Sequence, residues 1–377
     1  MKIHVVKKRE TLRDIAQRYA VGEAELINAN QLAGPGRLCP GQSLFIPGAL
    51  PSGLGSIEVL AFISRPPAAE RLRECLPYFT YACQYSHSFS PAGELLPPEP
   101  GPPVSGLRGG GCAPLLCLSN IDESGGFSPR LAHLLFTESE VRAALMDELF
   151  TKLAAGSYYG VHLSFNYLFP FDRDNYSSFV SELSELLHAR GFMLSVELAP
   201  REGAGMGSAL SAGQDYSALG KAADRLSLMF CRWAHAYSPP QALAPVMPLR
   251  EALRHAAANI PPEKLLLGVS GAGFDWRLPW RQGDEARPIS NARAMELAVS
   301  LGAEIKLDSA SDSPWFLYSD AEEKRHIVFF EDARSLRSKL QLLDEFSLAG
   351  ISLYTADRPL RPALHVMESL YSVEKLL

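Results

Sequence analysis

The 377-residue sequence predicts an α/β protein: a parallel (β/α)8 barrel with a small insertion, preceded by a small βααβ domain. From residue 57 onward, eight apolar strand-like runs alternate with amphipathic helical stretches, which is the pattern of a parallel barrel. The first 48 residues instead follow the order strand, helix, helix, strand. A stretch rich in Gly, Pro and Ser separates the two parts, so we expect domains at 1–48 and 57–377 joined by a linker at 49–56.

The N-terminal domain is predicted element by element. Residues 4–6 form a short strand, and Thr11 is suited to cap a helix that runs to Tyr19, because the apolar residues between them recur at helical spacing. Residues 24–30 give a second short helix. Residues 42–47 close the domain as a strand that ends at a proline.

The barrel elements follow in order. The expected strands are residues 57–63, 78–84, 114–119, 159–165, 192–198, 225–230, 265–269 and 350–354. The expected helices between them include residues 138–154, 176–190, 249–258 and 335–346. Residues 270–330 are too many for one crossover and are predicted to be an insertion, with strand-like pieces at 305–307, 315–318 and 326–330. Residues 91–111, which are dense in Pro and Gly, are predicted to be an irregular loop.

Composition excludes several function classes. A net charge of −6 argues against nucleic acid as a partner and leaves uncharged glycan as a natural one. No apolar run reaches the roughly 18 residues of a membrane span, and the N-terminus lacks the apolar core of a secretory signal, so we expect synthesis in the cytoplasm. We expect no cofactor and no metal, because the cysteines lack metal-ligand spacing and are predicted to be free or buried thiols. They are Cys39, Cys75, Cys83, Cys112, Cys117 and Cys231.

Residues 1–48 resemble a LysM domain. The resemblance rests on His4, Val5, Val6, Glu10, Thr11, Leu12, Ile15, Ala16, Leu26, Asn28, Asn30 and residues 38–47. It implies binding of N-acetylglucosamine polymers, chitin or peptidoglycan, in a shallow groove lined here by residues 10–12 and 27–31. The glycan-binding residues expected in this groove are Glu10, Thr11, Leu12, Asn28 and Asn30. The alternative is that these residues only cap helices and hold the domain together.

The remainder of the chain resembles glycoside hydrolase family 18, a family of TIM barrels. Within that family it is similar to the LysM-bearing N-acetylglucosaminidases of bacterial spores, which degrade cortex peptidoglycan. The stretches that carry the resemblance are residues 160–167, 169–176, 198–200, 260–268, 274–276 and 330–334.

The resemblance places the family's catalytic acids, Asp-Gly-x-x-x-Asp-x-Glu, on the fourth barrel strand. In this chain the first of these positions is Tyr159, the aspartate before the glutamate is Ser164, and the proton-donating glutamate is Asn166, with His162 at a further inward position. An amide has no proton to give to a leaving group at any useful pH. The sequence therefore predicts that the family reaction is lost, whether His162, Ser164 and Asn166 face an open cleft or fill the barrel interior.

Two further family positions depart in the same direction. The family's Met-x-Tyr-acid-Trp after the sixth strand ends here in Cys231, Arg232 and Trp233. The aromatic residue expected at the cleft floor on the last strand is Tyr354. Trp233 and Tyr354 are suited to stack on a sugar ring or, alternatively, to pack at the barrel rim.

One acidic residue opposes the inactive reading. Glu197 lies on the fifth strand, where the family has a small residue. It is either a relocated general acid, a partner of Arg232 or His162, or an exposed side chain.

These observations favour a catalytically inactive family 18-like protein that binds N-acetylglucosamine-containing glycan on a bacterial spore or cell wall. The first alternative is an active glycosidase with a displaced acid such as Glu197 or Asp275, and the second is a structural or scaffolding protein.

Overall fold

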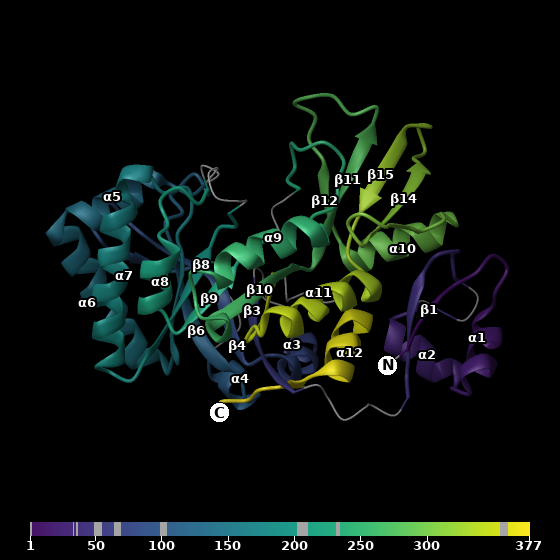
Figure 1. Ribbon diagram of the computed structural model, residues 1–377, viewed down its shortest axis with the longest axis horizontal. Coiled ribbons are helices and arrows are strands. Elements are labelled where there is room, and N and C mark those ends of the chain that lie inside the picture. Colours follow the sequence, from purple (N-terminus) through teal and green to yellow (C-terminus); the bar gives the residue numbers. More distant parts are fainter. Residues whose placement is uncertain are drawn as a thin grey trace.

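The computed structural model describes residues 2–32, 34, 37–48, 55–63, 69–98, 104–201, 210–230, 234–354 and 361–377. Three parts are visible in Figure 1: the N-terminal module, the barrel, and an inserted sheet that rises above the barrel. The expected linker at 49–56 lies outside the described residues except for its last two positions.

The N-terminal module has the predicted βααβ order. Its elements are β1 (Lys2–Val5), α1 (Leu12–Tyr19), α2 (Glu23–Asn30) and β2 (Ser43–Ile46), and the two strands pair antiparallel. Thr11 caps α1 as predicted and forms a capping box with Asp14. A small separate core, which includes Leu12, Ile15 and Leu26, holds the module together.

The barrel is closed by eight parallel strands, as predicted. They are β3 (Ser56–Ile63), β4 (Tyr81–Phe89), β6 (Ala113–Ser119), β7 (Gly160–Ser164), β8 (Met193–Leu198), β9 (Arg225–Leu228), β10 (Leu265–Ser270) and β16 (Gly350–Tyr354). Each strand pairs with the next, and the β3–β4 pairing closes the ring. β4 extends to Phe89, beyond the predicted end at residue 84. Its register shifts between Gln84 and His87, which breaks the alternation that the prediction relied on.

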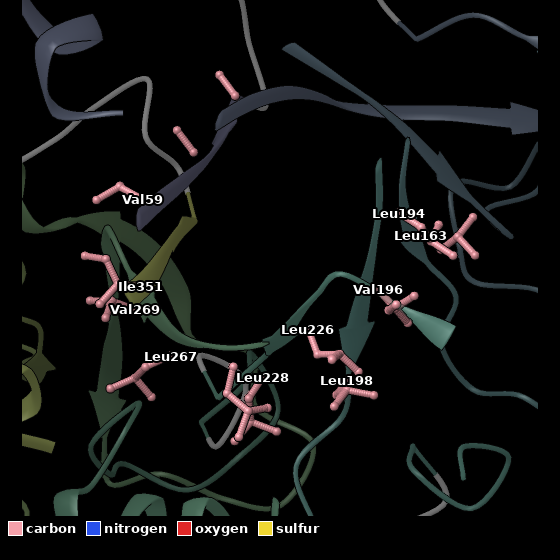
Figure 2. Close-up of a cluster of buried hydrophobic side chains, with 14 of the residues drawn as sticks. Val59, Leu163, Leu194, Val196, Leu198, Leu226, Leu228, Leu267, Val269 and Ile351 are labelled. Carbon is pink, nitrogen blue, oxygen red and sulfur yellow. The ribbon is translucent and has the colours of Figure 1, made fainter. Parts of the chain in front are cut away.

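Alternate side chains of these strands point outward and form the main core against the helices. Figure 2 shows a ring of such residues, among them Leu163, Val196 and Leu267. The helices around them are α3 (Ala69–Cys75), α4 (Val104–Gly109), α5 (Pro129–Thr137), α6 (Ser139–Gly156), α7 (Arg173–His188), α8 (Tyr216–Ala222), α9 (Val246–Ala257), α11 (Ala333–Phe346) and α12 (Arg361–Leu370). The inward side chains are therefore those of the alternate set, which includes His162 and Glu197.

The predicted loop at 91–111 is more ordered than expected. It contains β5 (Leu95–Leu96), which pairs antiparallel with β4, and the six-residue helix α4. Both elements are too short to give a periodic signal, and α4 contains two glycines, so the composition alone indicated a loop.

The insertion after β10 is a five-stranded antiparallel sheet with one helix. Its elements are β11 (Ala272–Leu278), β12 (Arg287–Ser290), α10 (Asn291–Leu301), β13 (Lys306–Asp308), β14 (Ser313–Ser319) and β15 (Arg325–Phe329). The last three strands were predicted, whereas β11, β12 and α10 were not. A single residue, Gly271, separates β10 from β11, so the sequence shows one continuous run where the chain leaves the barrel.

The N-terminal module lies against both the barrel and the insertion. The ring of Phe45 on β2 stacks on that of His365 on α12, with centroids 5.3 Å apart. The backbone amide of Ile305 in the insertion donates to the carbonyl of Pro40, at 2.9 Å. Figure 1 shows α12 between the module and the barrel strands. The module is therefore held in a defined position on the barrel.

Two predictions made from the sequence composition can be compared with the structure. Cys39, Cys75, Cys83, Cys112 and Cys117 are buried free thiols, as predicted, and Cys231 lies outside the described residues. Among the described helices, none combines the length and the apolar character needed to cross a membrane.

Candidate functional site

Three polar side chains that follow the period of β7 point into the barrel. His162, Ser164 and Asn166 are each 0% exposed, whereas their outward neighbours, such as Leu163, belong to the main core. Tyr159, just before β7, is half-buried near Tyr81. The structure thus places all three side chains in the barrel interior, away from solvent.

Glu197 is the centre of this interior cluster. Its carboxyl Oε1 accepts hydrogen bonds from the Asn166 amide at 2.6 Å and from the Ser164 hydroxyl at 3.0 Å. Its Oε2 accepts from the Tyr354 hydroxyl at 2.8 Å. The side chain is 0% exposed, so the acid is buried among three neutral donors.

Of the two predicted partners of Glu197, only His162 lies among the described residues. His162 does not contact Glu197: its Nδ1 lies 2.9 Å from the hydroxyl of Ser195, two positions earlier on β8. His162 on β7 and Ser195 on β8 are register partners in adjacent parallel strands, so their side chains lie side by side. Cys231, Arg232 and Trp233 lie outside the described residues.

Burial lowers the pKa of His162 to about 3 and that of His87, a buried residue of β4, to about 4. Both imidazoles are neutral in the folded protein near neutral pH, whereas the unfolded chain protonates them near their ordinary value of 6.5. The unfolded state therefore binds more protons as the pH falls below that value. Folding stability is complete above it and is lost toward the folded-state pKa values.

We expect His162→Gln to flatten this loss of stability. Each buried histidine contributes at most about 1.4 kcal/mol per pH unit. Urea unfolding between about pH 7 and about pH 4 should show a shallower decline of the unfolding free energy in the variant. The exposed His235 provides the control, because His235→Gln should leave the slope unchanged. Parallel curves for His162→Gln and the wild type would contradict the assignment.

Tyr354 lies at the C-terminal end of β16, as predicted, and contacts the interior cluster around Glu197. One face of its ring stacks on Phe62 of β3, with centroids 4.5 Å apart, and its hydroxyl is directed at Glu197. The ring is half-buried, and these contacts hold it in the barrel packing.

Several cluster residues were not foreseen from the sequence. The Tyr85 hydroxyl lies 3.0 Å from that of Ser164. Asn120, just after β6, holds the backbone of Asn166 with two hydrogen bonds of 3.0 Å. The polar residues near the C-terminal ends of β4 and β6 are the sequence signal for these contacts. The C-terminal ends of all strands lie at the same end of a parallel barrel, so residues there come close together.

Exposed aromatic rings flank this end of the barrel. Tyr167 directly follows Asn166, has a φ of 55°, and is 46% exposed, with its ring 6.1 Å from that of Phe127. Phe171, in the same loop, is 68% exposed and stacks on Phe169. Such rings can pack against the apolar faces of sugars. From the sequence, this role was expected only for Trp233 and Tyr354.

Asp275, the other acid considered as a displaced catalyst, forms ion pairs and a hydrogen bond within the insertion. It lies on β11 in the inserted sheet and is 3% exposed. Its carboxylate contacts Arg287 at 2.8 Å, His326 at 2.8 Å and the Tyr318 hydroxyl at 2.7 Å. These contacts make it the centre of an ion-pair network within the insertion.

The N-terminal residues expected to line a glycan groove divide into two groups. Leu12 is 1% exposed in the module core, and the amide of Asn30 clamps the backbone of Phe45. Glu10 is bound by His4 and Arg18. These three side chains hold the fold, which was the alternative reading. Thr11 and Asn28 are exposed, although the Thr11 hydroxyl also caps α1 through Asp14.

The described residues offer no cluster of three or more His, Cys, Asp or Glu side chains placed to bind a metal ion.

Comparisons with known proteins agree with this architecture. The profile of glycosyl hydrolases family 18 matches residues 117–358, and that of the LysM domain matches residues 4–47. The cortical fragment-lytic enzyme of Bacillus subtilis (strain 168) is 32% identical over 411 aligned residues, which cover 94% of each chain.

Two solved structures are similar to most or all of this chain. The spore cortex-lytic enzyme SleL of Bacillus megaterium QM B1551 superposes with a TM-score of 0.82 at 26% identity, covering 100% of this chain and 87% of that one. A chitinase from Chromobacterium violaceum ATCC 12472 gives a TM-score of 0.77 at 26% identity, covering 83% and 98%.

Proposed function

From the premise that this chain belongs to glycosyl hydrolase family 18, we propose that it binds N-acetylglucosamine-containing glycan of a spore or cell envelope without hydrolysing it. In this proposal the LysM module makes the principal contact with glycan. The barrel holds the module in place and offers exposed aromatic rings beside its closed interior.

The observation that carries the inactive half of the proposal is the occupation of the acid positions by Ser164 and Asn166. Both are buried, and both donate hydrogen bonds to Glu197 rather than facing solvent. Loss of a general acid typically slows a reaction by about 10²–10⁴-fold. The second acid position holds a hydroxyl, which cannot supply the negative charge that the family's intermediate requires.

The binding half is supported by the module and by the barrel surface. The LysM match spans residues 4–47, and its relatives are named as enzymes that act on spore cortex. Thr11 and Asn28 place short polar groups on the module surface. Tyr167 and Phe171 add exposed rings near the barrel mouth. A single small module of this kind is expected to bind in the millimolar to micromolar range, equivalent to about 4–8 kcal/mol.

A second candidate function follows from the hydrogen bonds inside the barrel. Ser164, Asn166 and Tyr354 all donate to Glu197, and these links between strands β7, β8 and β16 favour a rigid support. The barrel then acts as a scaffold for the module or for a protein partner. In this candidate the glycan affinity of the full chain equals that of the module.

We expect the full chain to sediment with insoluble peptidoglycan. Soluble chitooligosaccharide should displace the protein from the pellet, and no reducing sugar should be released during the assay. Asn28→Ala should weaken retention severalfold, because it removes an exposed amide from the module surface. Asn259→Ala is the matched control, since Asn259 is also an exposed asparagine near a helix end but lies on the barrel. Retention that is insensitive to Asn28→Ala and to chitooligosaccharide would contradict the proposal.

A further inference from the structure

The LysM module is attached to the barrel by a side chain that its own core does not use. Along β2, Leu44 and Ile46 pack in the module core, whereas Phe45 between them belongs to the main core of the barrel and is 6% exposed. Successive side chains of a strand point to opposite faces, so Phe45 leaves the module on the side of α12. There its ring stacks on that of His365, with centroids 5.3 Å apart. The Phe45 side chain therefore anchors the module but does not fill its core.

The end of α2 is attached to the same helix. α12 begins at Arg361, and the first amides of a helix have no partner within it. The backbone amide of Arg361 donates instead to Oε1 of Gln31, at 3.2 Å. Gln31 is the C-cap of α2, and its own amide donates to carbonyls of α2, so its position follows the end of that helix. The module thus caps a helix of the barrel.

These contacts lie on one wall of the expected glycan groove. The LysM resemblance assigns that groove to residues 10–12 and 27–31, and the contacts with α12 fall on the second segment. Asn28, the exposed asparagine of this segment, lines a cavity of about 580 Å³ whose other wall is α12, with Arg361 and His365. Ligand sites typically have volumes of about 300–1,000 Å³. A glycan that reaches Asn28 therefore enters a space that α12 bounds.

The wall that α12 provides is already engaged with other groups of the protein. Arg361 is paired with Glu74, and the His365 ring lies 3.4 Å from the carboxylate of Glu368. Gln31, on the module side, uses its side-chain oxygen for α12. A polar group that has a partner must give it up to bind a ligand, and this loss offsets much of the gain. α12 therefore covers this segment rather than adding contacts for a ligand.

We propose that α12 gates the glycan groove of the LysM module: the docked module is the low-affinity state, and a glycan bound along residues 27–31 competes with the contacts of α12. The inference rests on the proposed function and concerns the regulation of its glycan site. Docking and glycan binding are reciprocally coupled, because each weakens the other by the same factor. The apparent affinity equals the intrinsic affinity multiplied by the fraction of chains whose module is released. Weaker docking therefore gives tighter binding.

The first test measures binding of chitohexaose to the full-length chain by isothermal titration calorimetry. Phe45→Ala and His365→Ala each remove one of the two stacked rings, from opposite sides of the contact. Each variant should bind chitohexaose severalfold more tightly than the wild type, because a larger fraction of its modules is released. Both residues lie outside the expected groove segments, so neither change removes an expected ligand contact.

Phe150→Ala is the matched control. Phe150 is a half-buried phenylalanine that packs against the main core from α6, on the side of the barrel away from the module (Figure 1). Its loss should leave the affinity for chitohexaose unchanged.

Hydrogen exchange of the full-length wild type follows the gate itself. Chitohexaose should speed amide exchange at the start of α12, because the amide of Arg361 loses its acceptor when Gln31 is released. Exchange measured without the sugar is the reference.

An unchanged or lower affinity in His365→Ala overturns this inference and leaves the proposed function standing, as does unchanged or slower exchange at the start of α12. His365→Ala decides the point even if Phe45→Ala fails to fold, because His365 lies on α12 and not in the module. Absence of binding to chitohexaose and to insoluble peptidoglycan, in the wild type and in both variants, overturns the proposed function itself.

Discussion

Full-length protein is expected to release no reducing sugar above background from chitooligosaccharides or from peptidoglycan, and Asn166→Ala and Glu197→Gln are expected to leave that result unchanged. Asn166 cannot protonate a leaving group, and the nearest carboxyl, Glu197, is 0% exposed and already accepts three hydrogen bonds. The expected deficit is at least about 10²–10⁴-fold relative to a family 18 enzyme that retains both acids, which serves as the positive control. Turnover that survives Asn166→Ala but disappears in Glu197→Gln would show that Glu197 is a relocated acid.

Restoring the family acids tests the same point from the opposite direction. Ser164→Asp with Asn166→Glu would place a new carboxyl where an amide now lies 2.6 Å from Glu197. Two carboxyl groups in contact cannot both ionise, so this double variant starts from an unfavourable arrangement. Adding Glu197→Ala removes the conflict. Any turnover should therefore be higher in the triple variant than in the double variant, and the reverse order would contradict the proposed packing of the cluster.

Glu197→Ala on its own is expected to destabilise the protein strongly. It leaves the Ser164 hydroxyl, the Asn166 amide and the Tyr354 hydroxyl without their acceptor in a buried site. Buried donors left unpaired cost about 1–3 kcal/mol each, so we expect a loss of about 3–5 kcal/mol in the free energy of unfolding, measured by urea denaturation.

The conservative change separates hydrogen bonding from charge. Glu197→Gln keeps one acceptor oxygen for Asn166 and Ser164 and offers an amide to the Tyr354 oxygen, so its unfolding free energy should lie within about 1 kcal/mol of the wild type. Equal losses for Ala and Gln would mean that the negative charge, and not the hydrogen-bond network, stabilises the site. No loss for Ala would mean that the cluster contributes nothing to stability.

The sequence by itself determined the barrel and the βααβ module. Its strand signals are local, because the side chains of a strand alternate between two faces with a period of two residues. This period alone placed His162, Ser164 and Asn166 on the inward face and Leu163 on the outward face, and the structure agrees. The prediction that Ser164 and Asn166 cannot act as acids likewise needs no tertiary information, since a hydroxyl or an amide keeps its chemistry in any fold.

The tertiary structure alone decided which side chains meet. Tyr354 reaches Glu197 from 157 residues away because β16 lies across the barrel from β8, three strands along the ring. The parallel register of β7 and β8 places His162 beside Ser195. The position of the LysM module against α12 and the insertion, and so the contact between α12 and residues 27–31, also has no signature in local composition. These contacts depend on strand order, register and domain packing. Such features join residues that are distant in the chain, and no periodic pattern within one segment records them.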